Sequence, residues 1–226
     1  MAGGVFEPRD VDEVLDCRGR GDAVDRPARL IATCSVATIP PAWIEQVRPG
    51  GTIVTSLYRQ LVGQSLIRLT ARGDGTASGT LLDDTGGFMP MRAHQRLSHD
   101  AVIRHAMHQD GHKRRSAIGP VVDDGPAWLH LADLLMPGAA RTDITCDVGD
   151  VQWLVHPDGS WAYHDSASGD VEQGGARRLW DQLEHIHQLW VADGEPTRDH
   201  IGISVGTAGE HQVWLRDPAN VIDPGS

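Results

Sequence analysis

From Arg29 onward the chain alternates short apolar runs with glycine and proline turns, and the first of these runs predict a strand–helix–strand unit. Residues 30–36 and 52–57 are β-rich apolar runs with the length of buried strands. Between them, Pro40-Pro41 favours the first turn of a helix over residues 42–47, because that turn needs no N–H from proline. A strand, a helix and a second strand in this order predict two parallel strands joined by a right-handed crossover.

A second unit follows, in which two β-rich runs flank a tight turn. Residues 65–70 and 76–82 are the runs, and Arg72-Gly73-Asp74-Gly75 between them is typical of a β-hairpin turn. We therefore expect an antiparallel hairpin that extends the parallel sheet. Together with the preceding unit it predicts an α/β domain over residues 1–93.

The remaining chain has a different pattern. Residues 94–120 are polar with weak helical spacing, and we interpret them as a connector. Residues 121–226 alternate strand-like runs with turns, so we expect a small α+β domain there. Its predicted elements are a strand and a short helix within residues 121–135, strands at residues 143–147 and 151–156, and a final hairpin of residues 201–205 and 211–215.

One long helix is predicted in this C-terminal part, over residues 176–193. Its apolar side chains recur at spacings of three and four residues, so they lie on one face of the helix. They are Leu179, Leu183, Ile186 and Trp190. We expect this face to be buried against the strands that carry Trp153, Trp161 and Trp214.

The composition is that of a globular protein and argues against several classes of function. The 226 residues carry 31 acidic and 20 basic side chains, a formal net charge of -11, which argues against a nucleic-acid binder or a polybasic membrane-surface protein. No apolar run is long enough to span a bilayer, and residues 1–10 lack the pattern of a secretory signal. The three cysteines, Cys17, Cys34 and Cys146, form no CxxC motif, which predicts a reducing, cytoplasmic location.

The histidines and the nucleophilic side chains form no recognisable catalytic motif. His185 and His187 stand two apart in the predicted helix and diverge, and no HExxH motif is present, so we expect no metal site. Ser35 lies outside any GxSxG motif, and no pattern singles out a histidine partner for Cys34. Both are interpreted as small residues at the end of a strand.

That strand end nevertheless carries the most informative pattern in the chain. Residues 32–36 place small hydroxyl and thiol side chains at the carboxyl end of a predicted parallel strand, where open α/β sheets bind their ligands. With the following helix and the Val47-Arg48-Pro49-Gly50-Gly51 step into the next strand, the order resembles strands four and five of S-adenosylmethionine-dependent methyltransferases. It resembles the protein-L-isoaspartate O-methyltransferase family in particular, of the actinobacterial type associated with peptide modification. Further pieces that resemble this family are residues 75–79, 88–92, 158–161, 178–181 and 213–218.

The resemblance implies a partial Rossmann-like methyltransferase sheet and a set of site residues. Thr33, Cys34 and Ser35 would border the carboxylate of an aspartyl or isoaspartyl peptide, and Asp16 would face the adenine of S-adenosylmethionine. The family's glycine-rich cofactor turn and its ribose-binding acid have no counterpart, because only 29 residues precede the strand-four run. We therefore expect this chain by itself to bind S-adenosylmethionine weakly or not at all.

The function predicted from the sequence is methyl transfer from S-adenosylmethionine to an aspartyl or isoaspartyl carboxylate, in a chain that is truncated or has a mis-assigned start. The alternative is a non-catalytic peptide-binding or scaffold module built on the tryptophan-rich C-terminal part; an inert remnant is a third interpretation. Loss of the first strands leaves an open apolar edge on the sheet, so we expect self-association or pairing with a separate N-terminal half.

Overall fold

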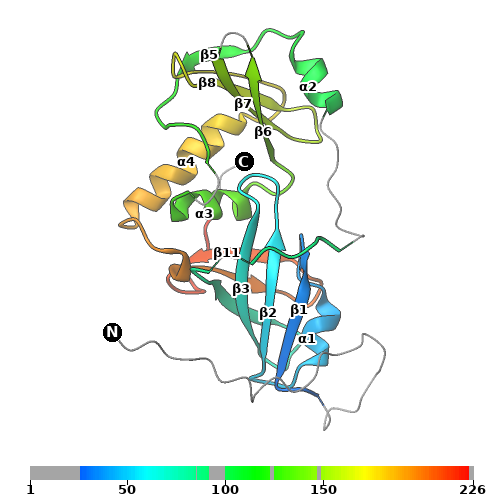
Figure 1. Cartoon of the computed structure of the whole chain (residues 1–226). Coiled ribbons are helices and arrows are strands. Elements are labelled where there is room, and N and C mark those ends of the chain that lie inside the picture. The colour runs from blue at the N-terminus through cyan, green and yellow to red at the C-terminus, as the bar shows by residue number, and fades with distance from the viewer. Residues whose placement is uncertain (1–25, 85, 92–99, 123–124, 147–148, 224–226) are drawn as a thin grey trace, which may run out of the picture.

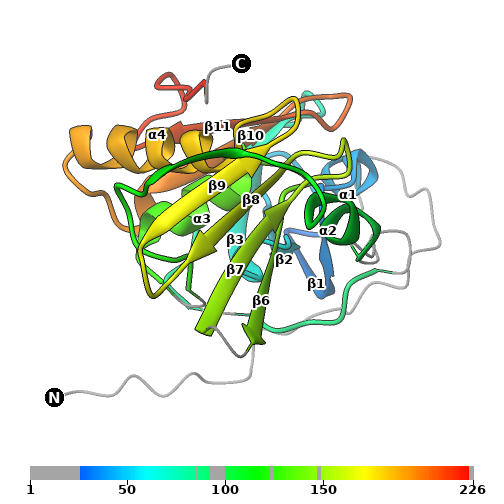
Figure 2. The same ribbon diagram turned by 90° about the horizontal axis from the view of Figure 1, so that it is seen from above.

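The computed structural model of the chain describes residues 26–84, 86–91, 100–122, 125–146 and 149–223. Their strands form two sheets, and two of the helices, α3 and α4, lie between these sheets (Figures 1 and 2). The first sheet has the order β1-β2-β3-β4-β10-β11, formed by β1 (Arg29–Val36), β2 (Thr52–Tyr58), β3 (Gln64–Ala71), β4 (Ala77–Leu81), β10 (Ile201–Val205) and β11 (His211–Leu215). The second has the order β5-β9-β8-β7-β6, formed by β5 (His112–Arg115), β6 (Ala140–Cys146), β7 (Gly149–Val155), β8 (Trp161–Asp165) and β9 (Asp170–Gly174). The helices are α1 (Pro41–Gln46), α2 (Asp100–Ala106), α3 (Ala127–Leu135) and α4 (Leu179–Ala192).

The predicted strand–helix–strand unit is confirmed. β1 and β2 pair in parallel, with Leu30 opposite Ile53, and α1 connects them. The predicted hairpin of β3 and β4 is confirmed as well, and β3 pairs antiparallel to β2. The first sheet is therefore mixed, with one parallel pair extended by antiparallel strands.

The final hairpin belongs to this first sheet, which corrects the prediction that it forms part of a C-terminal α+β domain over residues 121–226. β10 pairs with β4, with Ser204 opposite Ser78, and β11 adds beyond β10. β4 would otherwise be an unpaired edge. Ile201 and Ile203 on β10 are fully buried in the core beneath that sheet. Burial of these side chains favours the pairing, which joins the end of the chain to its beginning.

The segment predicted as a connector, residues 94–120, contributes α2 and β5. β5 pairs with β9 at the edge of the second sheet, and Arg114 on β5 forms ion pairs with Asp181 and Glu184 on α4. The described residues 121 and 122, where a strand was predicted to begin, are not part of a strand. The amide of Gln152 instead accepts from the N–H of Val121 and donates to its carbonyl, each at 2.7 Å, as a neighbouring strand would.

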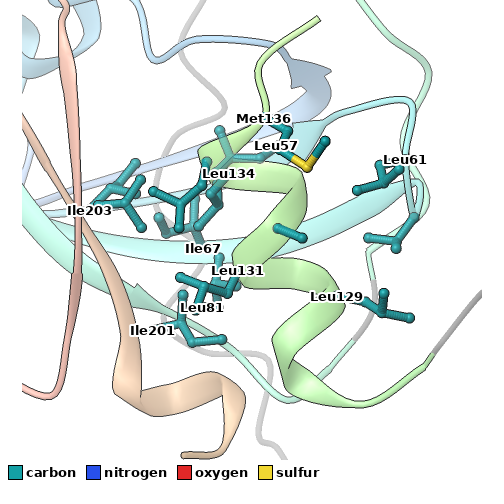
Figure 3. Packing of buried hydrophobic residues seen from close by; sticks show 14 of the residues in the cluster. Leu57, Leu61, Ile67, Leu81, Leu129, Leu131, Leu134, Met136, Ile201 and Ile203 are labelled. Atoms are coloured by element: carbon teal, nitrogen blue, oxygen red, sulfur yellow. The ribbon is translucent and has the colours of Figure 1, made fainter. Parts of the chain in front are cut away.

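One face of the first sheet packs against the main core. Along β3 the side chains alternate, so that Ile67 and Leu69 are fully buried whereas Arg68 and Thr70 are exposed. Figure 3 shows Ile67, Leu81 and Ile203 of the first sheet around Leu131 and Leu134 of α3. The same core includes Ile44 of α1, so the opposite face of β1, β2 and β3 has no helix of this core against it.

The apolar face of α4 is buried as predicted, and its partners include the strands β7 and β8. Leu179, Leu183 and Ile186 are at most 1% exposed and pack in one core with Leu154, Ala162 and Val171 of the second sheet. Trp153 and Trp161 belong to a separate cluster on the other face of that sheet, together with Ile103 and Ala106 of α2. The strands that carry Trp153 and Trp161 therefore pack against α4 as predicted, but through Leu154 and Ala162, because side chains alternate along a strand.

Candidate functional site

The carboxyl end of β1 is held in place by residues 86–91, which cross the open face of the first sheet. The Gln64 side chain is the main tether, since its Nε2 donates to the Phe88 carbonyl at 2.7 Å and its Oε1 accepts from the Phe88 N–H at 2.8 Å. Ser56 on β2 donates to the Gly86 carbonyl at 2.8 Å. The segment then runs beside β1, where the Ser35 N–H donates to the carbonyl of Met89 at 3.0 Å.

The three residues predicted to border a substrate differ in their accessibility. Thr33 is exposed on β1, and Cys34 is a half-buried thiol whose backbone carbonyl accepts from the Thr55 hydroxyl. Ser35 is fully buried, and its hydroxyl donates to the Phe88 carbonyl at 2.9 Å. Ser35 can therefore reach a carboxylate only by giving up this bond. Asp16, predicted to face the adenine, lies outside the described residues.

Replacement of Gln64 by alanine is expected to loosen residues 86–91 without unfolding the protein. The change removes two hydrogen bonds to one backbone unit, at a net loss of about 1–2 kcal/mol. Hydrogen exchange of the amides in residues 86–91 would rise in Gln64→Ala. Gln212→Ala, which alters an exposed glutamine on β11, serves as the control and leaves that exchange unchanged. Equal protection in both variants would contradict the role given to Gln64.

A second polar cluster lies near the end of β2 and was missed by the sequence analysis. Asp133 of α3 is 3% exposed, and its carboxylate accepts from the N–H of Leu61 at 3.1 Å. Arg59 follows β2 directly, and His211 of β11 accepts at Nε2 from the N–H of Ile39 at 3.1 Å. Asp133 sits in the run Leu131–Leu135, and this single acid in an apolar helix was the available signal.

The charges of this cluster are strongly affected by burial. Removal from water raises the pKa of the Asp133 carboxyl to about 7, although the positive charge of Arg59 opposes the rise. Burial, together with the positive charge of Arg59, lowers the pKa of His211 to about 4. Perturbed groups of this kind occur at active sites and in buried structural networks alike. Because Asp133 is enclosed and ties α3 to the β2–β3 turn, we assign this cluster to the structure of the core.

The exposed side chain of Thr33 therefore marks the accessible part of the candidate site. A hydroxyl and a thiol at this strand end can hydrogen-bond a carboxylate, but the described residues do not fit S-adenosylmethionine. The loop after β1, residues 37–40, contains no glycine, and α1 has Pro40 as its N-cap residue, with no N–H to offer an anion. The loop after β2 begins with Arg59-Gln60 and offers no acid for a ribose.

Metal-binding clusters and membrane-spanning helices were both considered for the described part of the chain. Within it, no group of three or more His, Cys, Asp or Glu side chains is arranged to hold a metal ion. None of its helices has the length and hydropathy that crossing a membrane requires.

Comparison with known proteins gives a distant likeness. No family model matches the chain, and no curated protein matches it. Among solved structures, a protein-L-isoaspartate O-methyltransferase aligns with a TM-score of 0.42 and 14% sequence identity, over 87% of this chain and 57% of that one. The chain thus spans little more than half the length of that structure. A likeness this distant carries no functional argument, and the proposal below rests on the sequence pattern and the geometry of β1.

Proposed function

We propose that the chain is a protein-L-isoaspartate O-methyltransferase-like protein, which serves the transfer of a methyl group from S-adenosylmethionine to an aspartyl or isoaspartyl carboxylate of a peptide or protein. The observation that carries the proposal is the parallel β1–α1–β2 unit with Thr33, Cys34 and Ser35 at the carboxyl end of β1. This is the place and the residue order in which the sequence resembles that family.

In this proposal, the described residues bind the carboxylate that accepts the methyl group. The Thr33 hydroxyl donates a hydrogen bond to the acceptor carboxylate, and the Cys34 side chain lines its surroundings. A carboxylate is already ionised at neutral pH, so the acceptor needs no general base and gains from orientation alone. Because the described residues do not fit the cofactor, no role in holding S-adenosylmethionine is assigned to them.

Calorimetry with an isoaspartyl peptide tests this proposal on the purified 226-residue chain. We expect saturable binding of the peptide that weakens about tenfold or more in Thr33→Val, the loss of one hydrogen bond to a charged group. Thr142→Val, on the second sheet, is the control and binds as the unaltered chain does. Absence of peptide binding would overturn the proposal, and equal binding by both variants would overturn the role of Thr33.

Titration of the same chain with S-adenosylmethionine is expected to show no micromolar binding. The missing polar anchors are worth about 1–3 kcal/mol each, so their loss weakens binding by orders of magnitude. Methylation of the isoaspartyl peptide by this chain alone would refute this expectation. Peptide binding without methyl transfer, even when the cofactor-binding half of such an enzyme is supplied, would favour the non-catalytic peptide-binding alternative.

A further inference from the structure

Among the residues that the structure describes, the outer edge of β1 has no strand paired with its first half. The N–H of Thr52 on β2 donates to the Ala28 carbonyl at 2.8 Å, so the backbone of residues 28 and 30 faces β2 and that of Arg29 and Ile31 faces outward. Within the part of the chain that the structure describes, no strand pairs with these outward groups. An edge of this kind is a template for the pairing of another strand.

The side chains beside this edge do not protect it from pairing. Ile31 is 60% exposed, and no proline or inward-pointing charge interrupts β1. Parallel strand pairs such as β1 and β2 are normally covered on both faces, whereas here Ile31 and its neighbour Val54 lie on the face opposite the core that holds α1 and α3. The surface therefore has the properties of a docking edge.

The charges on this open face identify the kind of partner. Residues that lie opposite one another on neighbouring strands form two rows across this face. The rows contain two arginines, Arg29 and Arg68, and no carboxylate, although the protein has a net charge of -11. The remaining members are hydroxyl, amide, glycine and apolar residues. The rows are Arg29-Thr52-Thr70-Ser78-Ser204-Gln212 and Ile31-Val54-Arg68-Thr80-Gly202-Trp214.

This charge pattern argues against a second copy of the chain as the occupant. A two-fold dimer through β1 would place the same cationic surface against itself, and such an interface must be self-complementary. Arg29 and Arg68 instead complement a strand that carries carboxylates. The orientation of the added strand relative to β1 is inferred from pairing already present at this edge. Ser35 forms a parallel bridge with Pro90 through the Met89 carbonyl and the Met91 N–H.

We propose that the outer edge of β1 from Arg29 to Ile31 binds an extended acidic segment of a partner protein as an added parallel strand. Its carboxylates lie beside Arg29, in a positive potential to which Arg68 on β3 also contributes, and an apolar side chain covers Ile31. This interaction is separate from the acceptor role proposed for Thr33, and it requires no aspartyl or isoaspartyl residue in the partner.

Fluorescence anisotropy with a labelled peptide tests the proposal on the full chain. The probe is Glu-Thr-Val-Thr repeated twice, which places glutamate and valine alternately on one face of a strand and offers no isoaspartyl acceptor. We expect saturable binding that weakens about tenfold or more for Arg29→Glu, and that falls when salt rises from about 0.05 to about 0.5 M. Arg104→Glu, an exposed arginine of α2 beside the second sheet, is the matched control and retains binding.

Backbone pairing is tested with Ile31→Pro and Ile31→Thr. Proline removes an outward N–H and no bond between β1 and β2, a change that edge strands tolerate, whereas threonine keeps the N–H. We expect binding to be lost in Ile31→Pro and reduced only a few-fold in Ile31→Thr. Should Ile31→Pro fail to fold, a probe with alternate N-methylated amides tests the same pairing, and it is expected not to bind.

Several results would overturn the proposal. Two of them concern the probe: equal binding when lysine replaces glutamate, and unchanged binding of the N-methylated probe. The other two would show a different occupant of the edge: a dimer in sedimentation that Ile31→Pro dissociates, or protection of this edge by residues 1–25 of the same chain in hydrogen exchange. Loss of probe binding with intact binding of the isoaspartyl peptide would refute this inference alone.

Discussion

Leu183→Ala is expected to lower the free energy of unfolding by about 2–5 kcal/mol. The Leu183 side chain is fully buried at the centre of α4, in a core that includes Leu131 of α3 and Leu154 of the second sheet. Because α4 packs against α3 as well as the sheet, neighbouring side chains cannot collapse freely into the cavity. Denaturant unfolding followed by circular dichroism measures the effect.

The matched control for this prediction is Val191→Ala on the same helix. Val191 is 44% exposed, so its truncation removes little buried surface and is expected to change stability by less than about 1 kcal/mol. Similar losses in both variants would mean that α4 is not held by its buried face, and the packing described for the space between the two sheets would be wrong.

Asp133→Asn is expected to become more stable relative to the unaltered protein as pH rises. Burial raises the pKa of Asp133 to about 7, above its ordinary value of 3.8, so the folded state holds its proton more tightly than the unfolded state does. The stability of the unaltered protein therefore falls as pH rises between these values, by about 4 kcal/mol in total. Asparagine has no such titration, so the difference should shift by about 3 kcal/mol in its favour between about pH 5 and pH 8.

The comparison with Asp133→Asn isolates this group from His211, which acts in the opposite direction. Burial lowers the pKa of His211 to about 4, so His211 destabilises the fold as pH falls below its ordinary value of 6.5. Asp84→Asn, an exposed aspartate after β4, is the control and is expected to show no such shift. A pH-independent difference between Asp133→Asn and the unaltered protein would show that Asp133 is not held in a buried, neutral form.

Local patterns were sufficient to predict the elements that depend on neighbouring residues. The β1–α1–β2 unit follows from two apolar runs and the proline residues at 40 and 41, and α4 follows from the spacing of Leu179, Leu183 and Ile186. The position of the last hairpin could not be predicted, because it depends on pairing between Ser78 and Ser204, which are 126 residues apart. The surroundings of Val121 could not be predicted either, because its backbone N–H and carbonyl are bonded by the side-chain amide of Gln152 on β7 rather than by a neighbouring strand.

For the candidate site, the sequence likewise predicted the local features and missed those that depend on tertiary contacts. Small polar residues at the end of an apolar run placed Thr33, Cys34 and Ser35 in the second half of a strand, and β1 includes them, but the pattern did not distinguish the exposed Thr33 from the buried Ser35. The bond from Ser35 to Phe88 joins residues 53 apart, so no local pattern indicated that this hydroxyl is occupied. The enclosure of Asp133 depends on the contact of α3 with the β2–β3 turn, which is likewise a tertiary feature.

The pairing of β10 with β4 also has a consequence for biosynthesis. A ribosome that adds about 5–20 residues per second needs roughly 6–25 s to make the 126 residues between Ser78 and Ser204. Throughout this interval the nascent chain carries β4 without its neighbour and a core that lacks Ile201 and Ile203. The first sheet is therefore completed only after residues 201–215 have been made, and a nascent chain that is stalled before residue 201 exposes β4 as an unpaired edge.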